Sequence, residues 1–318
     1  MTQSFLSLPS FAKINWSLQV RSKRADGYHE VRTILQTISL CDSLQFEATG
    51  DGEISLVCDD PAIPTDHQNL VVQAAAALKK SFSVSAGVRV SLEKRIPSKA
   101  GLGGASSNAA ITLLALTHLW KLPVSTAALS KIASNLGADV SFFLLGGCAL
   151  ATGTGASVSS RSEHSSDQTH LIVITPNVGV STAEAYLALN SAALTTNATD
   201  PILSSFRNEA HNVDSRPWSP LDSLRNDFES VIFDIEPEIG RAKKSLIQAG
   251  AVGALLAGSG SSVFGIFAAQ EDQQRAISKL KLETGWRVFP CVTLSRNEYL
   301  RALSALDVSF LRSFYPGS

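Results

Sequence analysis

The sequence predicts an α+β protein of two domains, and three observations lead to that prediction. Within each half of the chain, strand-like segments come before helical ones and do not alternate strictly with them. The chain has 318 residues, a length more typical of two ordinary domains than of one. Hydrophobic residues make up 44% and charged residues 17%, which supports a substantial core. A region rich in serine, glycine and threonine near 155–170 marks the expected boundary, giving domains of 1–165 and 166–318.

Alternation of apolar and polar side chains predicts the strands of the first half. Between residues 14 and 20 every second residue is apolar, which is the period of a half-buried strand. This register places Lys13 and Asn15 together on the polar face. Further strands are expected at 31–40, 44–48, 54–58, 88–96 and 148–153.

The helices of the first half are indicated by composition and by their end signals. Residues 70–80 predict a helix with Asn69 as its N-cap. Residues 106–120 are apolar nearly all round, which is typical of a buried helix. Residues 125–136 predict a helix that begins with a serine cap and is closed by Gly137.

The second half contains a second set of strands and helices. Residues 191–220 are polar and irregular, and we expect a long loop there. Strands are expected at 171–175, 251–257, 263–267 and 286–293. Helices are expected at 181–190, 226–235, 238–249 and 271–283.

Charge and composition exclude several functional classes. The net charge is −1 and the longest basic run is RSKR at 21–24, so a nucleic-acid partner is not expected. A membrane span needs about 18 apolar residues in a row, and the sequence has no such stretch and no signal-peptide pattern at its start. The four cysteines form no CxxC pair and are interpreted as small buried hydrophobic residues, so no metal site is assigned. We therefore expect a cytoplasmic protein that acts on small molecules.

The stretch IPSKAGLGGASSNAA (96–110) packs three glycines into four positions just before two serines. A Walker A loop would need Gly-Lys-Ser/Thr at its end, and a dinucleotide-binding fingerprint would need a third glycine where Ser106 stands. The stretch is therefore neither of these loops. Its glycines would nevertheless allow successive N–H groups to converge on an anion, at the start of a helix whose dipole favours negative charge. Ser106 and Ser107 could bind phosphate or magnesium, or could simply cap that helix, and both interpretations stand.

This run resembles the phosphate loop of the galactokinase, homoserine kinase, mevalonate kinase and phosphomevalonate kinase (GHMP) superfamily. Two further signatures of that superfamily follow in the expected order, AKINWSL at 12–18 and AGSGSSVFG at 257–265. The segments FAKINWSLQV, RADGYHEVRTILQTISLCD, GADVSFFLLGGCALATGTG and RNDFE resemble the branch whose alcohol substrate carries cytidine diphosphate. Two departures are that Ala105 replaces a glycine common in the loop, and that 191–220 is unusually long and polar.

The resemblance implies a two-domain fold, with an N-terminal ribosomal-protein-S5-like domain and a C-terminal ferredoxin-like domain. It implies an enzyme that uses ATP and Mg²⁺ to phosphorylate the C2 hydroxyl of a cytidine-diphosphate-linked methylerythritol. Such a reaction belongs to the non-mevalonate route to isoprenoid precursors. The expected assembly is a monomer or a weak homodimer.

The resemblance also assigns the catalytic and ATP-binding residues. Asp139 would take the proton of the substrate hydroxyl, and the Lys13 cation would keep that aspartate ionised and stabilise transition-state charge. Taken by themselves, Asp139 would be interpreted as a cap of the short helix that follows it, and Lys13 as an ordinary strand lysine. The ATP-binding residues would be Asn69, Pro97, Gly101, Leu102, Gly103, Gly104, Ala105, Ser106 and Ser107.

The substrate-binding residues implied in the same way are Asn15, Tyr28, His29, Thr182 and Tyr186. The Tyr28–His29 pair would hold the cytosine ring by stacking and by edge hydrogen bonds, with Tyr186 on the opposite face. The helix-cap role of Asn69 could account for that residue fully, and a cap role is nearly as good an interpretation for Thr182. The GSGSS turn at 258–262 would face the phosphate loop, unless it is a plain hairpin turn.

Two other functions were weighed against this one. Another small-alcohol kinase, such as homoserine or mevalonate kinase, would need no aromatic pair, because its substrate carries no base. A non-catalytic nucleotide-binding relative would need no base such as Asp139. The presence of Tyr28, His29, Lys13 and Asp139 together therefore favours the cytidyl-substrate kinase.

Overall fold

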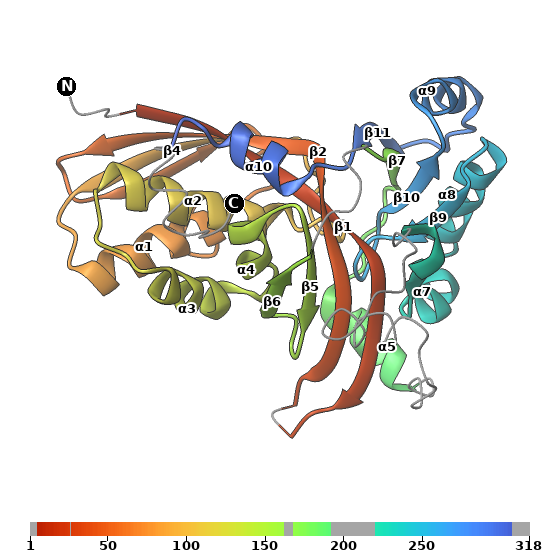
Figure 1. Cartoon of the computed structure of the whole chain (residues 1–318), viewed down its shortest axis with the longest axis horizontal. Helices are drawn as coiled ribbons and strands as arrows, with labels where there is room; N and C mark the ends of the chain where they lie inside the picture. Colours follow the sequence, from red (N-terminus) through yellow and green to blue (C-terminus); the bar gives the residue numbers. More distant parts are fainter. Residues whose placement is uncertain (1–4, 26, 162–167, 192–219, 307–318) are drawn as a thin grey trace, which may run out of the picture.

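The structure is a computed structural model that describes residues 5–25, 27–161, 168–191 and 220–306. Two sheets of different size, each with its own helices, form two units (Figure 1). The larger sheet has seven strands in the order β3-β4-β2-β1-β8, with β5 paired to β2 and β6 paired to β5. The smaller sheet has four strands in the order β11-β7-β10-β9. The α+β class predicted from the sequence is confirmed.

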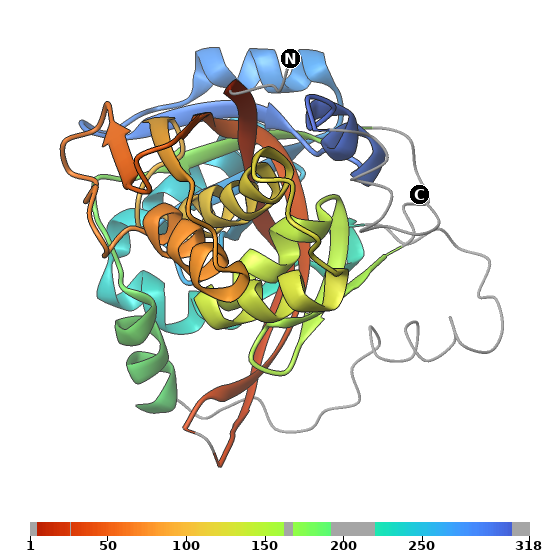
Figure 2. The same cartoon turned by 90° about the vertical axis from the view of Figure 1, so that its left-hand side faces the viewer.

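The first unit packs four helices on one face of the larger sheet, and Figure 2 shows these helices in front of the strands. Its helices are α1 (Leu70–Phe82), α2 (Gly104–Leu119), α3 (Thr126–Leu136) and α4 (Ala138–Leu145). Its strands are β1 (Phe5–Lys23), β2 (His29–Thr49), β3 (Ile54–Cys58), β4 (Gly87–Glu93), β5 (Cys148–Thr152), β6 (Ser157–Ser160) and β8 (Arg225–Asn226). The helix α2 is buried nearly all round in the core of this unit, as its composition predicted.

A long hairpin of β1 and β2 connects the two units. Its strands pair antiparallel from Phe5–Glu47 to Lys23–His29, and the tip extends well beyond the helices (Figure 1). The pairing of β1 with β2 shifts by one residue at Trp16, which forms a β-bulge. The Trp16 side chain packs in the apolar cluster shared with the second unit. The two strands expected at 31–40 and 44–48 are one continuous strand, because β2 stays paired with β1 throughout.

The second unit is an antiparallel sheet with helices packed against it. Its elements in chain order are β7 (His170–Thr175), α5 (Thr182–Ser191), α7 (Glu229–Ile235), α8 (Pro237–Gln248), β9 (Gly253–Leu256), β10 (Val263–Phe267), α9 (Gln270–Lys279) and β11 (Arg287–Val292). The core strands therefore follow one another as β-α-β-β-α-β, with the last strand beside the first. This is the ferredoxin-like arrangement that the resemblance implied.

The two units share an apolar layer and exchange elements. Trp16 of β1 packs edge-on against Phe264 of β10, with ring centroids 5.7 Å apart. The helix α10 (Arg296–Ala302) was missed by sequence analysis, and it returns to the first unit, where Tyr299 is buried and its hydroxyl donates to the Phe143 carbonyl. The proposed division at 165/166 falls in 162–167, outside the described residues, and stays a prediction.

The sequence predicted the ends of α1 and α3 more accurately than it predicted the irregular segments. Asn69 and Ser125 cap α1 and α3, and Gly137 ends α3, as predicted. The expected helix at 226–235 is wrong at its start, because two residues pair with β1 as β8 and the helix begins at Glu229. The strand β6 lies in the region rich in serine, glycine and threonine that was expected to mark the domain boundary. Most of the expected loop at 191–220 lies outside the described residues.

The cysteine interpretation is partly wrong. Cys148 and Cys291 are buried as expected, whereas Cys41 on β2 and Cys58 on the edge strand β3 are only half-buried. Burial raises the pKa of the Cys291 thiol to about 12. Such a thiol stays protonated at neutral pH and behaves as a small apolar side chain.

Candidate active site

A cavity of about 960 Å³ lies between the two units. Its walls come from the β1–β2 hairpin, the glycine loop, the start of α4, the start of α5 and the turn at 258–259. Among the sequence-predicted site residues, Ser107 alone lies outside the lining. The others that line it are Lys13, Asn15, Tyr28, His29, Asn69, Pro97, Gly101, Leu102, Gly103, Gly104, Ala105, Ser106, Asp139, Thr182 and Tyr186.

The glycine loop has the backbone geometry that an anion site needs. Gly101 and Gly103 have φ angles of 73° and 72°, in the left-handed region that favours glycine. The helix α2 begins at Gly104 with Gly103 as its N-cap. Because glycine has no side chain to cap the helix, the first N–H groups of α2 are left to a ligand. The loop therefore presents main-chain donors and the positive end of a helix dipole to the cavity.

Ser107 has a different role from the one that the sequence suggested. Its side chain is fully buried within α2, and its Oγ accepts a hydrogen bond from the Ser10 Oγ at 2.7 Å. The helix starts four residues earlier than a Ser107 cap would require, since its N-cap is Gly103. The cap interpretation of Ser107 is therefore wrong. Its ligand role stays a prediction, and among the two serines Ser106 is the one that lines the cavity.

The turn at 258–262 packs directly against the glycine loop. The Ser262 N–H donates to the Ala100 carbonyl at 3.1 Å. A Cβ added to Gly101 would lie 1.9 Å from the carbonyl oxygen of Ala257. The close approach of these two segments therefore requires glycine at position 101. The turn faces the glycine loop, as the resemblance implied.

Lys13 and Asp139 form an ion pair inside the cavity. The Lys13 Nζ lies 3.6 Å from the Asp139 Oδ2, and the side chains are 5% and 36% exposed. Asp139 lies in the first turn of α4, whose N-cap is Gly137, so the cap interpretation of Asp139 is wrong. The helix dipole and the buried ammonium both stabilise a negative charge on Asp139. A carboxylate held in this way can accept a proton from an alcohol that enters the cavity.

Asn15 holds the Lys13 ammonium in place. Its Oδ1 accepts from the Lys13 Nζ at 2.9 Å and from the Gly258 N–H at 3.0 Å. Its Nδ2 donates to the Thr33 Oγ1 at 2.7 Å. The second Nδ2 hydrogen makes no hydrogen bond within the described part of the chain, so it can still be donated to a substrate. Asn15 is thus first of all an anchor for Lys13.

Aromatic rings gather at the other end of the cavity. The His29 ring stacks on the Tyr186 ring, with centroids 4.9 Å apart and planes at 20°. Tyr186 in turn packs edge-on against Phe228 at 5.0 Å. Burial, and to a smaller extent the negative charge of Asp139, raise the pKa of Tyr186 to about 12. Tyr28 lines the cavity and its side chain is 67% exposed.

Two of the predicted site residues are engaged by neighbouring groups. The Asn69 Oδ1 accepts from the Val71 N–H at 2.9 Å, and its Nδ2 donates to the Pro64 carbonyl at 2.7 Å. The cap interpretation of Asn69 is confirmed, although the residue also borders the cavity. The Thr182 hydroxyl hydrogen-bonds to that of Ser259 at 3.1 Å, which links α5 to the turn at 258–262.

Comparison with known proteins identifies the family. The family model for the GHMP kinases N terminal domain matches residues 69–147, and the model for the GHMP kinases C terminal region matches residues 214–284. A 4-diphosphocytidyl-2-C-methyl-D-erythritol kinase of Exiguobacterium sibiricum is 37% identical over 270 residues, 85% of this chain and 92% of the relative. One from Chlorobium limicola is 38% identical over 284 residues, 89% of this chain and 95% of the relative. The chain belongs to the 4-diphosphocytidyl-2-C-methyl-D-erythritol kinase family.

Solved structures agree with this assignment. A crystal structure of a 4-(cytidine 5'-diphospho)-2C-methyl-D-erythritol kinase superposes with a TM-score of 0.72 at 31% identity, covering 91% of this chain and 99% of that one. A homoserine kinase from Cytophaga hutchinsonii gives a TM-score of 0.69 at 18% identity, covering 93% and 96% of the two chains. The second likeness shows the shared GHMP kinase fold alone. The resemblance found in the sequence motifs is thereby confirmed.

Two lysines of this GHMP kinase fold were missed by sequence analysis. Lys94 and Lys99 line the cavity on either side of Pro97, next to the glycine loop. Lys94 is ion-paired with the buried Asp42. The signal was available in EKRIPSK, where two lysines flank the start of a suspected phosphate loop. Both add positive charge where phosphates would lie.

Asp42 is the buried group that ties the loop to the sheet. Its carboxylate accepts from the Arg95 and Ile96 N–H groups, each at 2.8 Å, and from the Asn108 Nδ2 at 3.0 Å. Together with Lys94, these contacts join the end of β4 and the helix α2 to β2. A buried carboxylate with so many donors is well satisfied, and it fixes the start of the phosphate loop.

Among the residues that the structure describes, no cluster of three or more His, Cys, Asp or Glu side chains could hold a metal ion. Magnesium often takes only one or two protein ligands and completes its shell with substrate phosphates and water. The Ser106 hydroxyl beside the loop fits that requirement. In the described part of the chain, no helix is long and apolar enough to cross a membrane.

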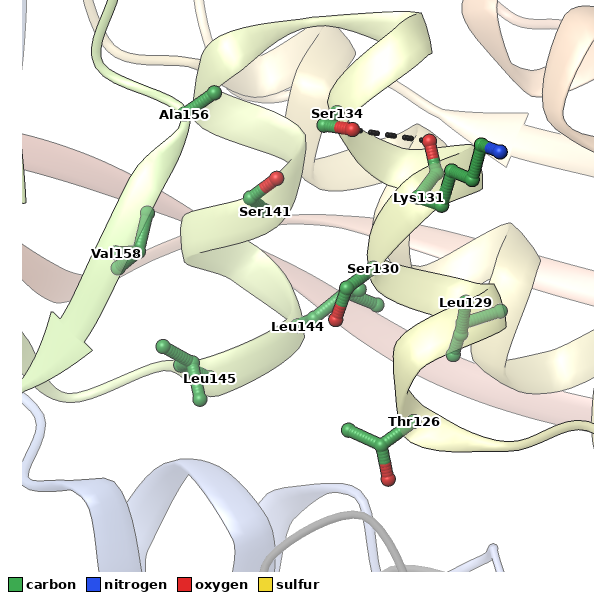
Figure 3. A pocket seen from close by; sticks show the side chains of 10 residues that line it. All are labelled: Thr126, Leu129, Ser130, Lys131, Ser134, Ser141, Leu144, Leu145, Ala156 and Val158. Carbon is green, nitrogen blue, oxygen red and sulfur yellow. Dashed lines mark hydrogen bonds between the residues drawn. The ribbon is translucent and has the colours of Figure 1, made fainter. Parts of the chain in front are cut away.

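A second cavity of about 410 Å³ lies between α3, α4 and β6 (Figure 3). Serine and threonine hydroxyls and apolar side chains line it together, and the Ser134 Oγ donates to the Lys131 carbonyl at 3.0 Å. It shares none of its lining residues with the large cavity. Asp139 and Ser141 of α4 therefore face two different cavities.

Proposed function

We propose that this protein transfers the γ-phosphoryl group of ATP to the C2 hydroxyl of 4-diphosphocytidyl-2-C-methyl-D-erythritol, a step toward isoprenoid precursors by the non-mevalonate route. The observation that carries the proposal is the Lys13–Asp139 ion pair, which lies in one cavity with both an anion-binding loop and an aromatic cluster. Each part corresponds to one need of the reaction: a phosphate cradle, a proton acceptor and a holder for the cytidyl group.

The glycine loop would hold the ATP phosphates. The main-chain N–H groups from Gly101 to Ser106 and the N-terminus of α2 supply donors, and Lys94 and Lys99 supply charge. Magnesium, when bound, would neutralise phosphate charge, with the Ser106 hydroxyl as its ligand from the chain. Asn69 and Pro97 border the same end of the cavity and would contact the nucleoside part of ATP.

Asp139 would act on the acceptor hydroxyl. As the C2 oxygen forms its bond to the γ-phosphorus, the bond from that phosphorus to the β,γ-bridging oxygen breaks and ADP leaves. The hydroxyl proton passes to a carboxylate oxygen of Asp139. The Lys13 ammonium, 3.6 Å from the Asp139 carboxylate, would stabilise the developing charge on the transferred group.

The aromatic cluster would choose the acceptor. Stacking of a base on an aromatic ring contributes about 1–3 kcal/mol, and the exposed side chain of Tyr28 in the cavity wall would supply such a ring. His29 and Tyr186 would contact the cytosine edge and its other face, and Thr182 and Asn15 would bind substrate oxygens. Mevalonate and homoserine carry no base, so they would gain nothing from this end of the cavity.

An ADP-release assay with Mg²⁺ and ATP tests the proposal. The panel contains 4-diphosphocytidyl-2-C-methyl-D-erythritol, mevalonate, homoserine and galactose at equal concentrations. We expect turnover of the cytidyl substrate to exceed that of the others by at least about 10³-fold, since a site built for a polar group rejects analogues that lack it. Phosphorus NMR of the product should show a new phosphomonoester and an intact diphosphate. The proposal would be overturned if the protein phosphorylated another alcohol faster than the cytidyl substrate, or if it phosphorylated none of the four.

A further inference from the structure

Asn226 is a buried amide of β8 whose three hydrogen bonds are all made to the main chain. Its Nδ2 donates to the Leu256 carbonyl at 2.9 Å and to the Gly258 carbonyl at 2.7 Å, and its Oδ1 accepts from the Phe228 N–H at 3.0 Å. The orientation of the amide is fixed, because two carbonyls need a donor and an N–H needs an acceptor. The side chain is only 5% exposed. Asn226 therefore holds one particular position of the turn that starts at Gly258.

A series of hydrogen bonds links that turn to the ion pair of Lys13 and Asp139. The Gly258 N–H donates to the Asn15 Oδ1, which also accepts from the Lys13 Nζ, and that ammonium faces Asp139. A continuous chain of hydrogen bonds thus runs from Asn226 through Gly258 and Asn15 to Lys13. It starts on β8 of the larger sheet, passes through the turn at Gly258 in the second unit, and returns to β1 of the first unit.

Close packing around Gly258 makes this chain sensitive to small shifts. A Cβ added at Gly258 would lie 3.1 Å from the Lys13 Nζ and 2.9 Å from the Gly101 carbonyl oxygen. The turn therefore touches both the lysine and the phosphate loop. Tightly packed groups transmit a displacement of one member to its neighbours. Movement of the turn would change the position of the ammonium relative to the transferred phosphoryl group.

We propose that Asn226 is a positioning residue for phosphoryl transfer, which acts through Gly258 and Asn15 to fix the place of Lys13. This proposal rests on the function proposed above for Lys13 and Asp139. Among the described residues, Asn226 is not part of the cavity lining, so it would touch neither substrate. Its loss should lower kcat and leave both KM values nearly unchanged, because ground-state contacts are retained.

Gln273 of α9 provides a matched control. Its buried Nε2 also donates to two carbonyls of the second unit, those of Leu171 at 2.6 Å and Cys291 at 2.9 Å. It lies outside the large cavity lining and in a different helix. Gln273→Leu and Asn226→Leu each leave two carbonyls without their side-chain donor. Asn226→Leu also removes the acceptor of the Phe228 N–H, so it should lose at least as much stability as Gln273→Leu, and only Asn226→Leu alters the site.

The experiment measures kcat, both KM values and thermal unfolding for these variants with ATP and the cytidyl substrate. Asn226→Leu should lower kcat by about 10- to 100-fold, because a misplacement of about 1 Å costs on the order of 100-fold. Both KM values should stay within about threefold, and Gln273→Leu should keep kcat within about twofold. Asn226→Asp keeps the side-chain volume and the acceptor for Phe228. It replaces the amide donor with a carboxylate oxygen that repels the Leu256 and Gly258 carbonyls, so it also displaces the turn and decides the result if the leucine variant does not fold.

A double-mutant cycle separates positioning from general destabilisation. If Asn226 acts through Asn15, adding Asn226→Leu to the Asn15→Ala variant should lower kcat by no more than about twofold further. Full additivity of the two effects, or an equal loss of kcat in Gln273→Leu, would overturn the proposal. Wild-type kcat in both Asn226 variants would overturn it as well. Wild-type protein that phosphorylates none of the alcohols would instead refute the proposed function.

Discussion

The two ends of the large cavity differ in whether main-chain or side-chain groups form most of their walls. The phosphate end is built around main chain, with Gly101 and Gly103 in left-handed conformations and the N-terminus of α2 beyond them, and a few polar side chains border it. The aromatic end consists of side chains, with Tyr28 exposed and His29 stacked on Tyr186. Main chain recognises charge and shape that every nucleoside triphosphate shares, whereas side chains distinguish one acceptor from another. Changes at the first end should therefore affect the whole reaction, and changes at the second should affect the choice of substrate.

The ion pair between the two ends should be the most sensitive place in the molecule. We predict that Asp139→Asn lowers kcat by about 10³-fold or more, since the amide cannot accept the hydroxyl proton. Binding of a cytidine nucleotide, measured by calorimetry, should be nearly unchanged, because the aromatic end is intact. Activity within tenfold of wild type would show that Asp139 is not the base.

The phosphate end can be tested with one methyl group. In Gly101→Ala the new Cβ would lie 1.9 Å from the Ala257 carbonyl oxygen, so the loop or the turn must move. We expect kcat/KM for ATP to fall by about 100-fold, because the donors to the phosphates are displaced. Gly250→Ala is the control: its φ is 105°, and within the described part of the chain a Cβ there would meet open space. That variant should lose about 1 kcal/mol of stability and keep its KM for ATP; equal effects of both changes would contradict the packing argument.

The aromatic end can be tested by removing its most exposed ring, that of Tyr28. Tyr28→Ala should raise KM for the cytidyl substrate by about 10- to 100-fold, which corresponds to the loss of one stacked base. The KM for ATP and the thermal stability should stay at wild-type values. Phe5→Ala removes another exposed aromatic ring, at the far end of β1, and should leave both KM values unchanged. A change confined to the KM for ATP would mean that the two ends have been assigned the wrong way round.

The same contrast explains which parts of the site could be predicted from the sequence. Glycine positions and helix caps depend on the local backbone, so the phosphate loop and the caps Asn69 and Ser125 follow from neighbouring residues. Ser107 was misplaced because α2 begins at Gly104, and a shift of two or three residues turns a side chain from the ligand to the core. Local patterns give the type of element more reliably than its first residue.

Contacts between distant segments could not be predicted in this way. The Gly258–Asn15 hydrogen bond joins residues 243 positions apart, and the Lys94–Asp42 pair joins residues 52 positions apart. Neither partner carries a pattern that names the other. The assignment of Lys13 and Asp139 came from the family resemblance, because a strand lysine and a helix-start aspartate are ordinary by themselves. The structure added the distance between them.

The smallest expected effect concerns the hydroxyl of Tyr186, which the stacking role of that ring does not require. Burial and the nearby Asp139 carboxylate raise its pKa from 10.0 to about 12. The folded state therefore keeps the phenol protonated, and the stability gained from this is complete below pH 10 and is lost as the pH rises toward 12.

Tyr186→Phe has no proton to lose. The difference in free energy of unfolding between wild type and variant should be constant from pH 8 to 9 and should shift by about 1 kcal/mol against the wild type by pH 11. Urea unfolding at these pH values measures this shift, with pH 8 as the control, and KM for the cytidyl substrate should stay within about threefold because the ring remains. Parallel stability curves up to pH 11 would show that water reaches the hydroxyl, and that this part of the aromatic end is more open than the stacked rings indicate.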